Sequence, residues 1–249
     1  MRILFINPNT SASFTAKIQA IAERHALPTT EVVATNPTAG PRSIEGIYDE
    51  LLSAAGTLEV AIRHLDDFDA FVIACYSDHP TIYALREITD KPVLGIAEAS
   101  MLTACMLGHK FSVVTTNREW EPLLSDAVRH YGLAERCASV RSTGMAVLAL
   151  ETAVPEHTDA LIIQAARTAV DQDGAEVICL GCAGMAGLDK KVTDALHVPV
   201  IDGVVSALKL LEGVVATGLR TSKRLAYAQP QYKQLDNLPE IFARPYQQP

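Results

Sequence analysis

Two cysteines, Cys75 and Cys182, occupy matching places in two similar stretches of the sequence. Each comes at the end of an apolar run rich in β-branched residues and directly before a turn into a helix pattern. In parallel α/β sheets, the carboxyl ends of the strands form the edge where ligands bind. Amide groups near a helix N-terminus lower the pKa of a thiol from about 8.5 and so supply a thiolate. Both cysteines are therefore candidates for proton transfer.

Two thiols that face each other across a cleft suit the inversion of a carbon acid. A thiolate removes the proton from one face of the carbon, and a thiol returns a proton to the other face. The roles exchange in the reverse direction, and the reaction needs no cofactor. Polar groups near the turns would stabilise the enolate oxygen as its charge develops. The candidates for this role are Asn9, Ser77, Thr115 and Thr116.

An internal repeat predicts that the two cysteines are equivalent in space. Residues 69–75 match residues 176–182 at an offset of 107 positions, and residues 2–9 match residues 110–117 at an offset of 108. Such self-similarity indicates two similar units. We expect a pseudo-two-fold axis between these units to bring the cysteines face to face.

Short apolar runs alternate with longer amphipathic stretches along the whole chain. This alternation is typical of an α/β fold, in which parallel strands are buried between helices on both faces of a sheet. The predicted strands are residues 3–6, 31–34, 70–75, 93–96, 111–115, 138–140, 177–180 and 198–201. The predicted helices are residues 11–25, 43–65, 81–88, 100–107, 120–131, 155–173 and 204–218. Residues 229–249 have no clear period and are expected to form a surface tail.

The repeat also predicts the domains. The first α/β domain is expected to comprise residues 1–97 together with residues 205–249, and the second to comprise residues 98–204. The last predicted helix has no place in the second repeat, so we expect it to return to the first domain. Each domain would be a short parallel sheet flanked by helices, with the active site in the interdomain cleft.

The composition excludes several classes of protein. The 249 residues carry 21 Lys and Arg against 29 Asp and Glu, a formal charge of −8, which argues against a nucleic-acid partner. Hydrophobic residues make up 49%, and the chain has no run of about 18 apolar residues that would enter a membrane. The first residues lack the apolar core of a signal peptide, and five cysteines form no disulfide framework. We therefore expect a cytoplasmic protein with free thiols.

Five motifs, in this order, resemble the hydantoin racemase branch of the aspartate/glutamate racemase superfamily. They are Asn7–Thr10, Gly40–Gly46, Ala74–Asp78, Gly95–Ala99 and Gly181–Met185. The resemblance runs from about residue 1 to residue 218. It implies a two-domain α/β fold, two-cysteine catalysis without a cofactor, and 5-substituted hydantoins as substrates. It also implies a homo-oligomer and a place in ureide or hydantoin breakdown, such as purine catabolism.

Within that branch, residues 75–80 look more like an allantoin racemase than like a racemase of amino-acid hydantoins. The latter usually carry Cys-Phe followed by Gly-Asp or a similar pair at this turn. Racemases of free aspartate or glutamate carry Thr or Asn directly after each catalytic cysteine, and this chain has neither. Allantoin has a polar ureido group, which Asp78, His79 or Asn9 would hydrogen-bond. The sequence therefore favours allantoin as the substrate.

The expected substrate-binding residues lie in the turns after the strands. They are Asn9, Gly40, Pro41, Ser77, Asp78, His79, Thr115, Thr116, Ala183, Gly184 and Met185. Residues 38–46, rich in turn formers, are expected to cover the site. Several of these residues also suit plain structural roles. Ser77 or Asp78 could cap the helix that begins near Pro80, and Asn9 could cap the helix near residue 11.

The other cysteines are expected to be structural. Cys105 falls in a helix pattern and Cys137 in a connecting loop. Cys179 and Cys182 form a Cys-x-x-Cys, but residues three apart in a strand point to opposite faces, and no second close pair supplies further ligands. We therefore predict no metal site. The single Trp120 is expected to be a packing residue.

Other functions remain open at this point. They are racemisation of amino-acid hydantoins, arylmalonate decarboxylation, maleate isomerisation and ligand binding without turnover. The decarboxylases need only the second cysteine, so the presence of Cys75 counts against that reading. Maleate isomerisation needs both cysteines, but its two carboxylates call for more donors than these turns offer. A binding module would not exchange the proton at C5 of the ring with solvent.

Overall fold

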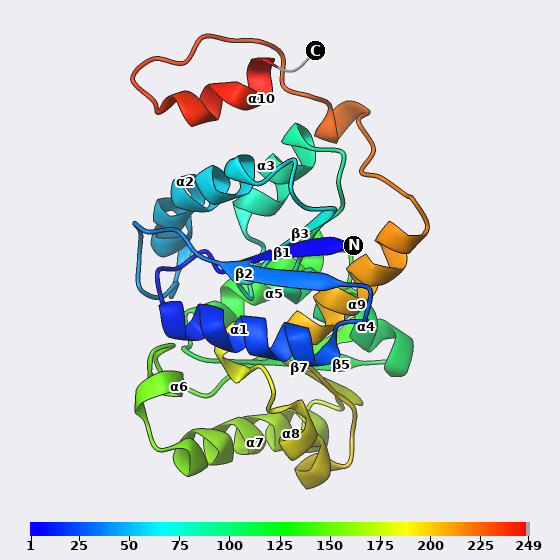
Figure 1. Cartoon of the computed structure of the whole chain (residues 1–249). Coiled ribbons are helices and arrows are strands. Elements are labelled where there is room, and N and C mark those ends of the chain that lie inside the picture. The colour runs from blue at the N-terminus through cyan, green and yellow to red at the C-terminus, as the bar shows by residue number, and fades with distance from the viewer. Residues whose placement is uncertain (248–249) are drawn as a thin grey trace.

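The first half of the chain folds into a parallel sheet between helices. The computed structural model describes residues 1–247, and Figure 1 shows how its helices and strands are arranged. The strands are β1 (Arg2–Ile6), β2 (Glu31–Thr35), β3 (Ala70–Ile73) and β4 (Val93–Gly95), and the helices are α1 (Ala12–His25), α2 (Ile47–Arg63), α3 (Pro80–Ile88) and α4 (Ile96–Leu107). The strands lie in the order β2-β1-β3-β4.

The second half repeats this arrangement. Its strands are β5 (Phe111–Thr115), β6 (Cys137–Ser142), β7 (Val177–Leu180) and β8 (Val200–Ile201). Its helices are α5 (Trp120–His130), α6 (Ala149–Thr152), α7 (Pro155–Asp171) and α8 (Asp189–Leu196), with short 3-10 helices η1 (Ala134–Arg136) and η2 (Ala183–Met185). The order β6-β5-β7-β8 corresponds strand for strand to the first sheet, and all pairs are parallel. The predicted α/β fold with two similar sheets is confirmed.

The C-terminal part returns to the first half of the chain. Helix α9 (Gly203–Ala216) packs against α1, α4, β3 and β4. After it come η3 (Leu225–Tyr227), η4 (Glu240–Ala243) and α10 (Arg244–Gln247), which lie beyond α2 and α3 at the top of Figure 1. The domain boundaries drawn from the repeat stay a prediction. Within residues 1–247, no helix is both long enough and apolar enough to cross a membrane.

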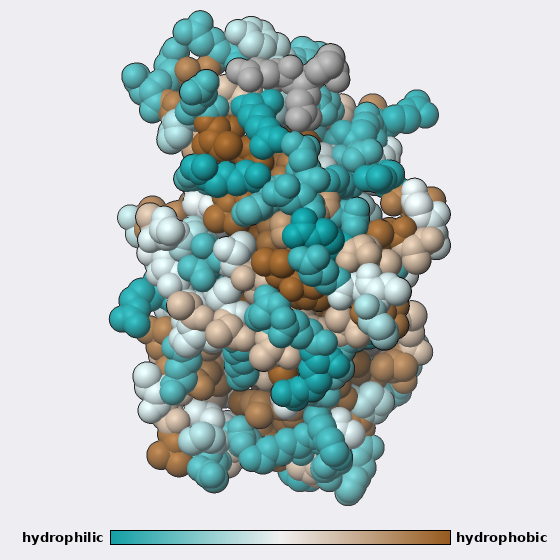
Figure 2. Space-filling model, in the orientation of Figure 1, coloured by the Kyte–Doolittle hydropathy of each residue, from teal (hydrophilic) through white to brown (hydrophobic). Residues whose placement is uncertain are grey.

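Side chains of β1 alternate between two cores, as the period of a strand requires. Ile3 and Phe5 join a buried cluster that includes residues of α1, α4 and α9. Leu4 and Ile6 join a second cluster, with α2 and α3. The first cluster also contains Phe111 of β5, so it lies between the sheets and holds them together. On the face that Figure 2 shows, hydrophilic residues predominate and apolar ones show mainly in the gaps between them.

Several predicted boundaries differ from those in the structure. Strand β4 turns directly into α4 at Ile96, where buried apolar residues of the first helical turn resemble a continuing strand. Helices α6 and α8 were not predicted, because their few turns are too short for a clear period. Cys137 opens β6 and does not lie in a loop. The chain leaves β3 after Ile73, two residues before the end of the predicted strand.

Gly181 connects β7 to Cys182 where two backbones lie very close. Its N–H donates to the carbonyl of Val114 at 2.7 Å. A Cβ atom at this position would lie 2.8 Å from that carbonyl oxygen and 3.1 Å from the Cα of Thr115. Because these neighbours are backbone atoms of β5, they cannot rotate away. Only a residue without a Cβ atom fits here, and it places Cys182 directly after the hydrogen bond between Gly181 and Val114.

We predict that Gly181→Ala lowers the free energy of unfolding by about 2 kcal/mol, as overpacking in a rigid core does. Gly213→Ala is the matched control, because a Cβ atom there meets nothing within 4 Å. In the interior of helix α9 this change should raise stability by up to about 1 kcal/mol. Denaturant unfolding followed by circular dichroism measures both. Equal stability of the two variants would contradict the close approach.

His79 forms the N-terminal cap of α3, a role for which the sequence indicated Ser77 or Asp78. Its side chain is fully buried, and Nδ1 accepts the N–H of Thr81 at 3.3 Å. Nε2 lies 2.9 Å from the hydroxyl of Ser53 on α2. Since Nδ1 accepts, the proton is on Nε2 and the ring is neutral. Burial lowers the pKa of His79 to about 4.

This pKa predicts a loss of stability in mild acid. Between about pH 6.5 and pH 4 the unfolded chain binds a proton at residue 79 that the folded chain does not bind. The free energy of unfolding therefore falls as the pH falls through this window, by about 3 kcal/mol in all from this one residue. His79→Asn keeps a capping acceptor but does not titrate, so its stability should depend less on pH. The control is His157→Asn at an exposed site. An unchanged pH dependence in His79→Asn would refute the assignment.

Candidate active site

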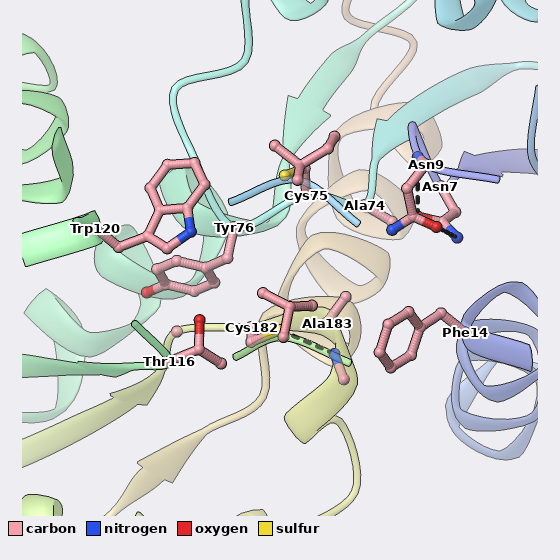
Figure 3. Close-up of a pocket in the computed structure, with 14 residues that line it drawn as sticks. Asn7, Asn9, Phe14, Ala74, Cys75, Tyr76, Thr116, Trp120, Cys182 and Ala183 are labelled. Atoms are coloured by element: carbon pink, nitrogen blue, oxygen red, sulfur yellow. Dashed lines mark hydrogen bonds between the residues drawn. The ribbon is translucent and has the colours of Figure 1, made fainter. Parts of the chain in front are cut away.

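One pocket collects residues from the carboxyl ends of both sheets. Its space is about 430 Å³, including the part that opens to solvent. Figure 3 shows it from close by. The lining consists of Asn7, Asn9, Phe14, Ile44, Ala74, Cys75, Tyr76, Thr116, Trp120, Val147, Gly181, Cys182, Ala183 and Gly184.

Cys75 and Cys182 lie on opposite sides of this pocket, above and below its open space in Figure 3. Each follows its strand by two residues, Cys75 after β3 and Cys182 after β7. The residue before each cysteine donates the last hydrogen bond to the central strand, Ala74 to Ile6 at 2.8 Å and Gly181 to Val114 at 2.7 Å. The repeat of strand order therefore gives the two thiols equivalent positions.

Backbone amides surround the Cys182 thiol. Cys182 caps the 3-10 helix η2, and the N–H of Gly184 donates to its Sγ at 3.4 Å. Burial raises the pKa of Cys182 to about 11, while the N–H of Gly184 and the charge of Lys17 oppose that rise. The Lys17 ammonium group donates to the carbonyl of Gly184. On balance the thiol is still the favoured form, but the N–H of Gly184 and the charge of Lys17 make the thiolate less unfavourable than burial alone would.

The Cys75 thiol has a different neighbourhood. The hydroxyl of Ser77 donates to its Sγ at 3.4 Å. Burial raises the pKa of Cys75 well above its ordinary value, and the negative charge of Glu50 raises it further. Ser77 acts in the opposite direction but more weakly. Cys75 therefore holds its proton more firmly than Cys182.

Two asparagines form the polar end of the pocket. Asn7 donates from Nδ2 to Asn9 Oδ1 at 2.9 Å and to Thr15 Oγ1 at 3.1 Å. Asn9 Oδ1 also accepts the N–H of Ser11, whose side chain is the actual cap of α1. Within residues 1–247, the Nδ2 amide of Asn9 makes no hydrogen bond, so its donors stay available to a ligand.

The pocket brings together about half of the site residues expected from the sequence. The expected residues that line it are Cys75, Cys182, Asn9, Thr116, Ala183 and Gly184. Ser77 lies behind Cys75 and touches its sulfur. Thr115 is buried, and its hydroxyl donates to the carbonyl of Gly181. Met185 packs in the core of the second sheet.

Asp78 and His79 do not line the pocket, contrary to the expectation that they bind a substituent. Asp78 accepts the hydroxyl of Tyr83 at 2.6 Å and lies 2.5 Å from Nδ1 of His130. His79 is occupied as a helix cap. Because the turn after Cys75 points these side chains toward α2, α3 and α5, they face away from the thiols.

The segment 38–46 reaches the pocket only through Ile44. The carbonyl of Pro41 accepts the N–H and the hydroxyl of Thr10, which ties this segment to the turn after β1. Gly40 and Pro41 themselves do not line the pocket.

The apolar walls of the pocket were missed by the sequence reasoning. They come from Phe14, Ile44, Trp120 and Val147, and from Tyr76. Trp120 was expected only to pack, and it is indeed buried, but it also faces the pocket. An apolar side chain in a helix pattern looks the same whether it meets a core or a cavity, so no sequence signal distinguishes the two.

The arrangement can act on opposite faces of a small flat molecule. One thiol stands on each side, the walls between them are largely apolar, and amide donors lie at one end. No group of three or more His, Cys, Asp or Glu side chains that could hold a metal ion occurs in the described part of the chain.

Comparisons with known proteins agree with this geometry. The family model for Asp/Glu/Hydantoin racemase matches residues 3–211. A hydantoin racemase of Pseudomonas sp. (strain NS671) is 44% identical over 245 residues, which are 98% of both chains. The solved allantoin racemase from Pseudomonas fluorescens has 43% identity and a TM-score of 0.92 over 95% of this chain and 100% of that one. The solved allantoin racemase from Klebsiella pneumoniae has 41% identity and a TM-score of 0.91, over 95% of this chain and 96% of that one. The chain therefore belongs to the Asp/Glu/Hydantoin racemase family and is a racemase.

Proposed function

We propose that this enzyme inverts the C5 centre of 5-substituted hydantoins by proton transfer between Cys75 and Cys182. The observation that carries the proposal is the pair of thiols on opposite sides of one pocket, each at the same point of an equivalent sheet. C5 of a hydantoin lies beside a ring carbonyl, so its proton is acidic enough for a thiolate to remove.

The reaction proceeds in two proton transfers. The thiolate on one side takes the C5 proton, and the electron pair moves into the adjacent carbonyl to form an enolate. Polar groups of the pocket lining can stabilise the enolate oxygen as its charge develops. The thiol on the other side then donates its proton to C5 from the opposite face. The product has the inverted configuration, and the two cysteines have exchanged protonation states.

Allantoin is the substrate that we propose within this class. It is the substrate named for the two solved structures that match at 43% and 41% identity. With Asp78 turned away, the Nδ2 amide of Asn9, on the Asn7 and Phe14 side of the pocket in Figure 3, is the donor that a ureido group would meet. This assignment would place the enzyme in purine breakdown. The homo-oligomer implied by the resemblance stays a prediction, which sedimentation can check.

Amino-acid hydantoins are the second candidate, because one observation favours them. The walls contributed by Phe14, Ile44 and Val147 are apolar and suit a hydrocarbon substituent at C5. The relative from Pseudomonas sp. (strain NS671) is also named a hydantoin racemase.

The two-base mechanism predicts the effect of removing either thiol. Cys75→Ser and Cys182→Ser should each slow racemisation by about 10²–10⁴-fold, since an alcohol is a poor acid and base for this step. Optical rotation measures racemisation, and proton NMR in heavy water measures deuterium uptake at C5. Cys105→Ser and Cys137→Ser are the matched controls and should keep wild-type activity. Enzyme-free blanks are needed because hydantoins racemise slowly alone.

Three outcomes would contradict the mechanism. If wild-type enzyme bound a hydantoin without deuterium uptake, the chain would be a binding module. If both serine variants racemised at the wild-type rate, the thiols would not be the acid and base. If only Cys182 mattered and CO₂ were released from an arylmalonate, the chain would be a decarboxylase.

The substrate assignment predicts a preference in kcat/KM. Allantoin should exceed 5-benzylhydantoin by at least about tenfold, because a benzyl group leaves the Asn9 amide unpaired. Asn9→Ala should reduce this preference, while Asn237→Gly, which removes an exposed asparagine side chain at a positive φ that glycine adopts without strain, should not. A preference for 5-benzylhydantoin in the wild-type enzyme would keep the mechanism and transfer the assignment to amino-acid hydantoins.

A further inference from the structure

The two thiols have equivalent backbone positions but unequal charged neighbours. On the Cys182 side, the half-buried Lys17 of α1 donates from Nζ to the carbonyl of Gly184. The N–H of the same Gly184 donates to Cys182 Sγ at 3.4 Å. One residue thus connects the ammonium group and the sulfur, and a positive charge stands beside this thiol.

On the Cys75 side the neighbouring charge is negative. Glu50 of α2 is half-buried, and its Oε1 has no hydrogen-bond partner among residues 1–247. Glu50 and Ser77 line a second cavity, which shares Trp120 with the pocket of the two thiols. Because Ser77 donates to Cys75 Sγ, it stands between this carboxylate and the thiol. No cation forms a salt bridge with Glu50 in the described part of the chain, so its charge acts on Cys75 without compensation.

We propose that Lys17 and Glu50 are positioning residues that make the two thiols unequal at rest, so that Cys182 ionises first and Cys75 keeps its proton. The unequal ionisation of the two thiols does not depend on the proposed function. Only its role in catalysis rests on that function. The resting enzyme would be ready for the enantiomer whose C5 proton faces Cys182. The opposite enantiomer requires the form in which the proton has moved from Cys75 to Cys182.

The pKa directions agree with this inequality. Burial raises the pKa of both thiols, but Lys17 and two backbone amides lower that of Cys182, whereas Glu50 raises that of Cys75. Burial also lowers the pKa of Lys17 and raises that of Glu50. The other groups that face this set are Glu45 toward Cys182, Asp78 toward Glu50, and Glu151, Asp159 and Asp202 toward Lys17.

The test is the pH dependence of alkylation at each cysteine. The folded enzyme reacts with iodoacetamide without substrate, and peptide mass spectrometry gives a rate for each thiol at each pH. Limited access to the pocket lowers the alkylation rate of a thiol by the same factor at every pH. The midpoint, the pH at which the rate reaches half its maximum, therefore gives the pKa of that thiol. We expect the Cys182 midpoint to lie at least about one pH unit below that of Cys75.

Each variant should shift only the thiol beside it. Lys17→Met should raise the Cys182 midpoint by about half to one pH unit, and Lys17→Arg should restore most of the difference. Glu50→Gln should lower the Cys75 midpoint by a similar amount. The matched controls are Arg24→Met at an exposed position of α1 and Glu59→Gln at a partly exposed position of α2, which remove the same charges. Neither control should move either midpoint by a comparable amount.

Two results would overturn the proposal. One is a Cys75 midpoint at or below that of Cys182 in the wild-type enzyme. The other is an equal shift in Lys17→Met and Arg24→Met, which would show a general effect of net charge. Circular dichroism checks folding, and if Lys17→Met does not fold, Lys17→Gln takes its place. Because alkylation needs no turnover, failure of racemisation leaves this test intact. In an active racemase, Lys17→Met should also shift the rising limb of the pH–rate profile to higher pH.

Discussion

Each candidate catalytic thiol follows the last hydrogen bond between two central strands, and the rest of the site depends on this constraint. Ala74 and Gly181 donate these bonds to β1 and β5, at 2.8 and 2.7 Å. The chain must leave the sheet at the next residue, so Cys75 and Cys182 stand at the sheet edge in a fixed direction. Rigid strands thereby position the thiols more accurately than flexible loops could.

Burial of the pocket has two opposite effects on proton transfer. It removes water from a reactive carbon, which strengthens every electrostatic interaction around it. It also disfavours a thiolate, as the raised pKa values of both cysteines show. The N–H of Gly184 and the charge of Lys17 offset part of this penalty at Cys182. Helix α1 matters to both effects, because it carries Phe14 of the apolar wall and Lys17.

The second half of the chain repeats the first in topology without repeating its chemistry. After Cys75 a buried histidine caps the nine-residue helix α3, whereas Cys182 itself caps the three-residue helix η2, which precedes α8. Identical strand order therefore fixes where the thiols stand, while the different turns determine which groups surround them. In this way, two nearly equivalent backbone positions can hold two thiols with different pKa values.

Periodicity and repetition in the sequence determined the α/β fold, the two equivalent sheets and the placement of Cys75 and Cys182 at their edges. Those features depend on local patterns, because a strand of period two and a helix of period 3.6 are properties of neighbouring residues. Only the tertiary structure decided that Asp78 and His79 face away from the thiols, that Trp120 borders the pocket, and that Lys17 and Glu50 stand beside opposite cysteines. These depend on the directions of turns and on contacts between segments far apart in the chain, which no local pattern encodes.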